Sequence, residues 1–154
     1  MVYRAFQQGL ELIHERYLQD QELAVIENYV NTFPVRVQAH NLLKSQQEQL
    51  LNSTLREFAK TESAMLDQYR QVCLRDLQLV LTMIAHVVIT DDVQRFNDSL
   101  LWVQNMMRSV KKEAYAAKGY KLLQSAIAAT LPAPCVEVIN PYLNQAIAMV
   151  SLPV

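Results

Sequence analysis

Three side chains that together could hold a ligand stand close in the run YRQVCLRDL, residues 69–77: Cys73, Arg75 and Asp76. On a helix, Cys73 and Asp76 are three positions apart and share a face. Arg75 lies on a different side of the helix, but its long, flexible side chain can reach a ligand that lies across the helix. The thiol can form a covalent bond, the guanidinium can neutralise an acid, and the carboxylate can accept hydrogen bonds from N–H donors. The run therefore has the groups that an anchored ligand with acidic and N–H substituents would need.

Two interpretations of this run stay open on its residues alone. An extended tetrapyrrole needs all three groups, because it is attached at a vinyl-derived carbon, carries propionates and presents pyrrole N–H groups. A core cysteine beside a surface ion pair would have the same sequence. The residues around the run have to decide between the two.

The chain has no motif for phosphate binding, metal binding or nucleophilic catalysis. Its two glycines, Gly9 and Gly119, form no phosphate-binding loop, and no HExxH, CxxC or clustered His/Cys/Asp set has metal-ligand spacing. No strand-turn-helix nucleophile elbow surrounds a serine, and Asp91-Asp92 is typical of a helix cap. His86 lies in an apolar stretch, where it is either a haem ligand or a core or interface histidine. We predict no metal site and no enzyme activity.

Composition indicates a protein of a reducing compartment. The chain has 154 residues, which suits one domain, and its hydrophobic fraction of 51% excludes a disordered chain. Its net charge of -1 gives no support to nucleic-acid binding. We expect no signal peptide and no membrane span, because no apolar run approaches the ~18–20 residues that a spanning helix needs. Cys73 and Cys135 do not suggest a secreted disulfide scaffold, so a cytoplasmic protein is predicted.

The elements that position these residues are predicted to be helices throughout. Two glycines in 154 residues, with abundant Leu, Gln, Ala and Glu, favour an all-α protein. The spacing of apolar residues predicts a globular bundle of seven or eight helices, with Leu23, Ile26 and Val30 facing inward and the helix from Met65 to Ile89 at the centre. The predicted helices span residues 3–17, 20–30, 35–60, 65–89, 93–110, 113–131 and 135–151, with stops at 31–34 and 131–134 and a kink or second start near Pro141.

The region around Cys73 resembles the phycobiliproteins, the globin-like light-harvesting proteins of phycobilisomes. Their pattern C-[LI]-R-D-hydrophobic-x-x-x-L is matched by CLRDLQLVL at residues 73–81, and Asp91-Asp92 falls where their Gly-Asp turn belongs. Leu101 follows in register without a gap. A looser likeness covers about residues 15–150 and includes YL at 17–18, VRVQA at 35–39 and NPYL at 140–143.

The resemblance implies one phycobiliprotein-like, globin-like domain over residues 1–154 that binds a linear tetrapyrrole (bilin) of the phycocyanobilin type. Cys73 would form the thioether, Asp76 would hold the pyrrole N–H groups, and Arg75 would pair with a propionate. The implied role is light harvesting or excitation transfer in or near a phycobilisome, at the thylakoid membrane surface. Its partners would be other phycobiliprotein, phycobilisome or photosystem subunits, or further copies of the chain. Cys135 lies near a second bilin cysteine of some relatives, but no flanking motif supports attachment there, so a structural cysteine is favoured.

Departures from the family pattern affect the pigment site. Between Arg36 and Cys73 the chain is several residues shorter than its relatives, which have a glycine-rich loop over the pigment there. The asparagine of that loop has no counterpart in this chain, and Ser63 is the residue nearest to its position. Gln68-Tyr69 replaces the arginine pair that precedes the cysteine, with Arg70 shifted by one position. One propionate contact of the family is thereby lost.

Other departures keep a different function open. Thr82 and His86 occupy the positions of an arginine and a tyrosine that bind the partner subunit in the family, so we expect no ordinary αβ pairing. The alternative function is a pigment-free adaptor or regulator of phycobilisome or photosystem assembly. Trp102 with Met106 and Met107 would then be a partner surface, although such a stripe is also typical of a core. A third hypothesis, a globin-like sensor of haem or a fatty acid, depends on His86 alone.

Overall fold

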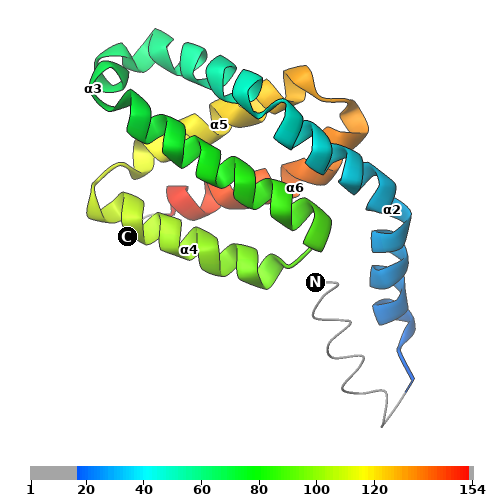
Figure 1. Cartoon of the computed structure of the whole chain (residues 1–154). Coiled ribbons are helices and arrows are strands. Elements are labelled where there is room, and N and C mark those ends of the chain that lie inside the picture. Colours follow the sequence, from blue (N-terminus) through cyan, green and yellow to red (C-terminus); the bar gives the residue numbers. More distant parts are fainter. Residues whose placement is uncertain (1–16, 153–154) are drawn as a thin grey trace.

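The structure, a computed structural model, describes residues 17–152, which form helices and turns with no strand among them. The all-α prediction is therefore confirmed for this range, and the helix predicted for residues 3–17, with Gly9 and His14, lies outside it. The helices are α2 (Asp20–Ser45), α3 (Gln47–Thr90), α4 (Val93–Ser109), α5 (Glu113–Thr130) and α6 (Ala133–Ser151) (Figure 1).

The prediction of seven or eight helices is wrong for the described residues, which contain five. The stop predicted at residues 31–34 does not end a helix. The predicted helices 35–60 and 65–89 meet within α3, where residues 61–63 join them with a backbone break at Glu62. Conversely, α2 ends at Ser45, inside the predicted helix 35–60, and Gln46 forms the turn to α3. Pro141 lies within α6 without dividing it.

Helix α2 continues through Pro34, where the sequence predicts a stop. A proline inside a helix removes one backbone hydrogen bond and costs ~3 kcal/mol. Here the Tyr29 hydroxyl and the Arg36 guanidinium, one on each side of Pro34, both donate to backbone carbonyls in the last turn of α3. Val30, whose carbonyl loses its partner, is 60% exposed, so solvent can reach that group. The contacts of Tyr29 and Arg36 with α3 thus offset the cost of the proline, and the helix continues through Pro34.

The first turns of α2 extend away from the other helices (Figure 1). No residue from 17 to 34 is buried. Leu23 and Val30 are exposed, so the prediction that they face inward is wrong. The reason is that this end of α2 projects beyond the helices that form the core.

Helix α3 is the central element, as predicted, and contacts each of the four other described helices. Its second half carries part of the core, in which Val80, Ile84 and Val88 are completely buried. The helix has two backbone breaks, at Glu62 (φ -135°, ψ 39°) and at Tyr69 (φ -124°, ψ 18°). The stretch between them is a short segment that changes direction relative to the rest of α3.

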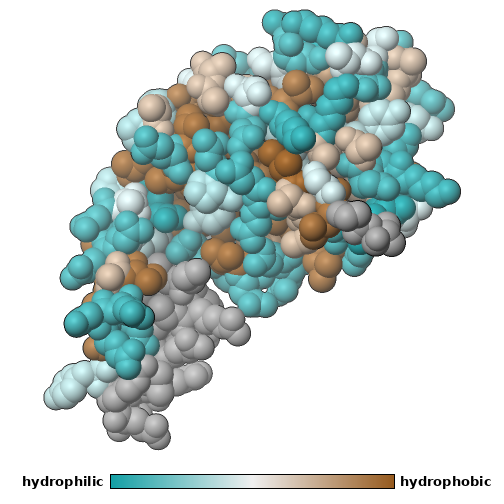
Figure 2. Space-filling model, turned by 180° about the vertical axis from the view of Figure 1, so that it is seen from behind, coloured by the Kyte–Doolittle hydropathy of each residue, from teal (hydrophilic) through white to brown (hydrophobic). Residues whose placement is uncertain are grey.

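By length and composition α3 is long and apolar enough to cross a membrane, and among the described residues it is the one helix of which this holds. This finding differs from the prediction, in which no apolar run approaches the length of a membrane-spanning helix. Core helices of globular proteins have the same composition, and part of this stretch is buried between the other helices. On the face seen in Figure 2, hydrophobic residues form patches broken up by hydrophilic ones.

The turn between α3 and α4 is formed by Asp91 and Asp92, as predicted. Asp91 has left-handed backbone angles (φ 50°, ψ 24°), which glycine adopts more easily than other residues. Asp92 caps α4, because its carboxylate accepts a hydrogen bond of 3.1 Å from the backbone N–H of Arg95. The turn fixes the angle between the two helices and directs the Asp91 side chain toward α6.

Candidate functional site

Cys73 and Asp76 line the same pocket, between α3, the end of α4 and the first half of α5. The pocket has a volume of about 70 Å³, and α5 approaches α3 closely there. A Cβ atom on Gly119 of α5 would lie 3.4 Å from Leu77 and 3.6 Å from Phe58, which is ordinary van der Waals contact, so the two helices pack directly against each other at this position. The lining is largely apolar and consists of Phe58, Met65, Tyr69, Val72, Cys73, Asp76, Leu77, Met107, Lys112, Tyr115, Ala116, Gly119 and Tyr120.

The three site residues predicted from the run 69–77 are only partly brought together. Cys73 and Asp76 share a face of α3, as their spacing predicts, and both are half-buried. Arg75 is exposed and does not line the pocket. Its positive charge is still felt by the Asp76 carboxyl group.

Burial raises the pKa of the Cys73 thiol, and the negative charge of Asp76 raises it further. The ammonium group of Lys112 acts in the opposite direction. The thiol sulfur also lies 3.7 Å from the sulfur of Met65. Since the thiolate is the reactive form, this thiol is less nucleophilic at neutral pH than a free cysteine unless its surroundings change.

Asp76 and Tyr120 form the deeper end of the pocket. Burial raises the pKa of the Asp76 carboxyl group, and Arg75 partly offsets this effect. Burial also raises the pKa of Tyr120, and the charge of Asp76 adds to the shift. Tyr120 is 1% exposed, and its hydroxyl has no hydrogen-bond partner. A buried polar group without a partner costs free energy, so a ligand that pairs with this hydroxyl gains by entering.

Lys112 closes the other end of the pocket. Its ammonium group lies 4.7 Å from the ring centre of Tyr69 and 5.1 Å from that of Tyr115, in a double cation–π contact. Sequence reasoning missed Lys112, Tyr115 and Tyr120. The spacing of residues 115, 116, 119 and 120 on one helical face was a usable signal for the wall of α5, but nothing near Lys112 distinguishes it from a surface lysine.

The residues that depart from the family pattern lie mostly away from this pocket. Ser63, Gln68 and Arg70 are exposed and do not line it, whereas Tyr69 does. Cys135 is completely buried in the core, which fits the structural role predicted for it. Neither cysteine is in a disulfide.

The residues proposed for partner binding lie on the outside of α3 and α4. Thr82 and His86 are exposed and line a groove between these helices. Trp102 is 59% exposed on α4, whereas Met107 is buried and faces the Cys73 pocket, so the predicted Trp102/Met106/Met107 stripe is divided between surface and core. The outward position of His86 does not favour a haem site. No group of three or more His, Cys, Asp or Glu side chains in residues 17–152 is arranged to hold a metal ion.

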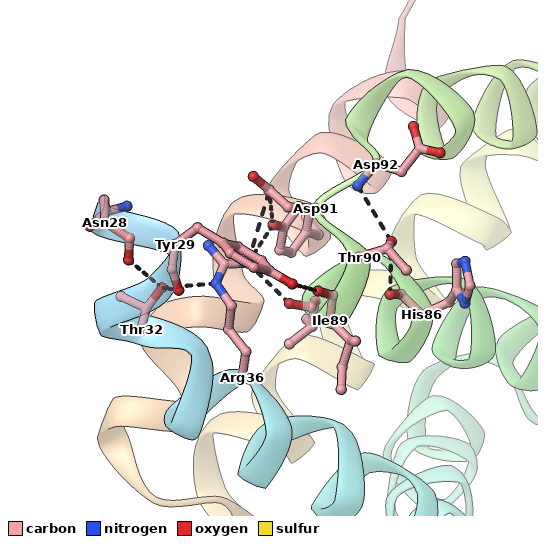
Figure 3. A network of polar contacts seen from close by, with 11 residues as sticks. Asn28, Tyr29, Thr32, Arg36, His86, Ile89, Thr90, Asp91 and Asp92 are labelled. Carbon is pink, nitrogen blue, oxygen red and sulfur yellow. Dashed lines mark hydrogen bonds and ion pairs between the residues drawn. The ribbon is translucent and has the colours of Figure 1, made fainter. Parts of the chain in front are cut away.

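A second polar cluster joins α2, the end of α3 and α6 around Arg36 (Figure 3). The Arg36 guanidinium donates to Thr32 (2.9 Å), to the backbone carbonyl of Val88 (3.0 Å) and to the Tyr142 hydroxyl (3.0 Å). Tyr142 in turn donates to the Asp91 carboxylate at 2.6 Å, and Arg36 lies 3.8 Å from the same carboxylate oxygen.

These contacts account for the unusual residue in the turn. Asp91 adopts left-handed angles where glycine would be easier, and its side chain is held by Tyr142 and Arg36. Burial and the hydrogen bond to Asp91 raise the pKa of Tyr142 to about 12. The groups of this cluster pair with one another and hold α2, the end of α3 and α6 together.

Comparison with known proteins gives one match. A family model described as "Phycobilisome protein" matches residues 13–150. No curated protein matches the chain.

Proposed function

Because the chain belongs to the phycobilisome protein family, we propose that it binds one linear tetrapyrrole of the phycocyanobilin type through a thioether at Cys73. The observation that carries this proposal is the pocket in which Cys73 and Asp76 meet, with the unpartnered hydroxyl of Tyr120 in its wall. The protein then absorbs light or transfers excitation in or near a phycobilisome. We propose no enzyme activity for it.

The residues of the pocket fit such a ligand in chemistry but enclose only part of it. Pockets for drug-sized ligands measure ~300–1,000 Å³. The volume beside Cys73 is about 70 Å³. In the proposed complex the pocket therefore takes the part of the ligand next to Cys73 and Asp76, and the remainder lies along the exposed side of α3. Arg75 is on that exposed surface, where it can pair with a propionate.

Each residue has a defined task in this proposal. The Cys73 thiolate adds to the ethylidene group of the ligand; a C–S bond forms, and the thiol proton ends on the neighbouring carbon, so no leaving group or oxidant is required. Because the pKa of Cys73 is raised, we expect attachment to depend on a lyase that assists deprotonation of the thiol. Asp76 accepts hydrogen bonds from pyrrole N–H groups, and its charge stabilises a protonated ring system. When bound, the tetrapyrrole supplies the conjugated system that absorbs visible light.

The proposed partners are other phycobilisome or photosystem subunits, or further copies of the chain, on the cytoplasmic surface of the thylakoid membrane. Family membership supports this placement. The exposed Thr82 and His86 support an assembly different from ordinary αβ pairing.

The experiment is co-expression with bilin synthesis and a panel of lyases, followed by intact mass and zinc-induced fluorescence in denaturing gels. We expect the mass to rise by one bilin, and Cys73→Ser to abolish the adduct because a hydroxyl is a far poorer nucleophile than a thiolate. Cys135→Ser is the matched control and should keep the adduct. An unmodified wild-type mass with every lyase would contradict the proposal.

A second candidate is a pigment-free adaptor with the same fold. The small volume of the pocket favours it, as do the exposed side chains of Leu79 and Trp102, which line one groove. The absorption spectrum and intact mass of the protein from its own cell separate the two candidates. A colourless protein of unmodified mass supports the adaptor, and a blue protein with one added bilin supports the pigment carrier.

A further inference from the structure

Lys112 is held in the pocket in a way that leaves its charge unpaired. It is the N-cap residue of α5, at the turn that leads from α4. Its ammonium group lies between the rings of Tyr69 and Tyr115 and contributes to the lining together with Cys73. The two rings limit the positions that the side chain can take, so the cation is presented to the pocket rather than free in solvent.

No anionic side chain neutralises Lys112 within residues 17–152. The ion pairs within this part of the chain join Arg36 to Asp91, Lys60 to Glu57 and Lys118 to Glu62. Asp76 lines the same pocket and has Arg75 as a neighbouring cation. Glu113, the next residue in the chain, lines a separate pocket with Arg108.

Tyr120 gives an independent indication that the pocket expects a ligand. Tyr120 lines the same pocket, and its hydroxyl is buried and lacks a hydrogen-bond partner. The polar groups that the pocket combines are therefore an orphan phenol, a carboxyl group, a thiol and an unpaired ammonium group. A ligand anchored at the thiol would meet these groups in the same pocket.

We infer that Lys112 pairs with a carboxylate of the ligand, and that the Tyr120 hydroxyl forms a hydrogen bond with a polar atom of the ligand beside Asp76. This inference depends on the proposed function, because it names the acid group and its partner within the same site. It assigns the carboxylate contact inside the pocket to Lys112, a residue outside the run 69–77, and leaves Arg75 for a second acid at the surface. A neutral apolar ligand would leave both Lys112 and Tyr120 unpaired.

The test separates recognition from attachment by using Cys73→Ser protein, which forms no thioether. Biliverdin and biliverdin dimethyl ester serve as probes, and binding is followed by absorption and by quenching of protein fluorescence. In the Cys73→Ser background, Lys112→Met should weaken binding of the acid about tenfold and leave the ester unchanged, because one charge-assisted contact is lost. Lys121→Met, an exposed lysine of α5, is the matched control and should change neither.

Two further variants guard against a simple folding defect. Lys112→Arg keeps the positive charge and should therefore still bind the acid more tightly than the ester. If Lys112 only capped α5, no such preference for the acid would be expected. Tyr120→Phe should weaken binding of both probes while raising the melting temperature of the free protein, since it removes an unpaired buried hydroxyl. Equal binding of acid and ester by the Cys73→Ser protein, or binding of neither, would overturn the inference. The mass of wild-type protein after co-expression would still report on attachment at Cys73.

Discussion

The polar cluster around Arg36 and the pocket around Cys73 lie at opposite ends of the second half of α3 and use similar groups for different purposes. Each combines a cation, a carboxyl group and a tyrosine. In the cluster, Arg36, Tyr142 and Asp91 pair with one another. In the pocket, Lys112 has no anion in the described chain, and the Tyr120 hydroxyl has no partner.

This difference separates groups that stabilise the fold from groups that are kept for a ligand. Buried polar groups are normally satisfied, because an unsatisfied one costs ~1–3 kcal/mol. The cluster follows that rule and ties three helices together. The pocket departs from this rule at Tyr120, whose hydroxyl has no partner. A protein can tolerate such an unsatisfied group when a bound ligand supplies the hydrogen-bond partner.

The largest effect expected is from Arg36→Met. This change removes the guanidinium that contacts Asp91 and Tyr142 in a nearly closed environment, where the Arg36 and Asp91 side chains are 10% and 14% exposed. We expect the free energy of unfolding to fall by about 3 kcal/mol in urea denaturation followed by circular dichroism. Lys60→Met, which removes an exposed ion pair with Glu57, is the control and should cost less than ~1 kcal/mol. Equal losses for the two variants would mean that the cluster does not stabilise the fold.

The same substitution in the two regions should have opposite signs. Tyr142→Phe removes a hydroxyl that is bonded to Asp91 and Arg36, so the free energy of unfolding should fall by about 1–2 kcal/mol. Tyr120→Phe removes an unpartnered hydroxyl and should raise it by about 1 kcal/mol. Denaturation of the two variants side by side is a direct check. A loss of stability in both would show that the Tyr120 hydroxyl has a partner in solution.

A smaller effect is expected on the reactivity of Cys73. The Asp76 charge raises the pKa of this thiol, so Asp76→Asn should lower that pKa and increase the thiolate fraction at any pH below it. Alkylation by iodoacetamide near pH 8 should become several-fold faster. Lys112→Met should slow it, because this cation lowers the pKa of the same thiol. Cys135 is buried in the core and serves as the unreactive internal reference. Unchanged rates in both variants would contradict the described arrangement of charges.

Sequence reasoning was most successful where a helical period alone decides the outcome. The apolar pattern of residues 65–89 correctly placed the core of the fold along α3, and the spacing of Cys73 and Asp76 correctly put them on one face. The number of helices was wrong because Pro34 is a strong local stop signal that is overcome by the contacts of Tyr29 and Arg36 with a helix end more than fifty residues away. No local pattern carries that information.

The candidate site was only half predictable for the same reason. Cys73, Arg75 and Asp76 are neighbours in sequence, and a motif could find them. Lys112 and Tyr120 reach the pocket only because α5 packs against α3 at Gly119. Whether Arg75 or Lys112 enters the pocket depends on this packing, which a single sequence without its relatives does not encode in any short motif.

The two breaks in α3 have a consequence for how the pocket can admit a bulky molecule. They isolate the segment from Glu62 to Tyr69, which supplies Met65 and Tyr69 to one wall. Its first end is fastened to α5 by the Lys118–Glu62 ion pair at 2.6 Å, and its second by the contact of Lys112 with Tyr69. Local opening of such a segment requires less free energy than opening of a continuous helix. We therefore expect this segment to open locally while the buried half of α3 stays intact, and its amide protons to exchange with solvent well before those of the core.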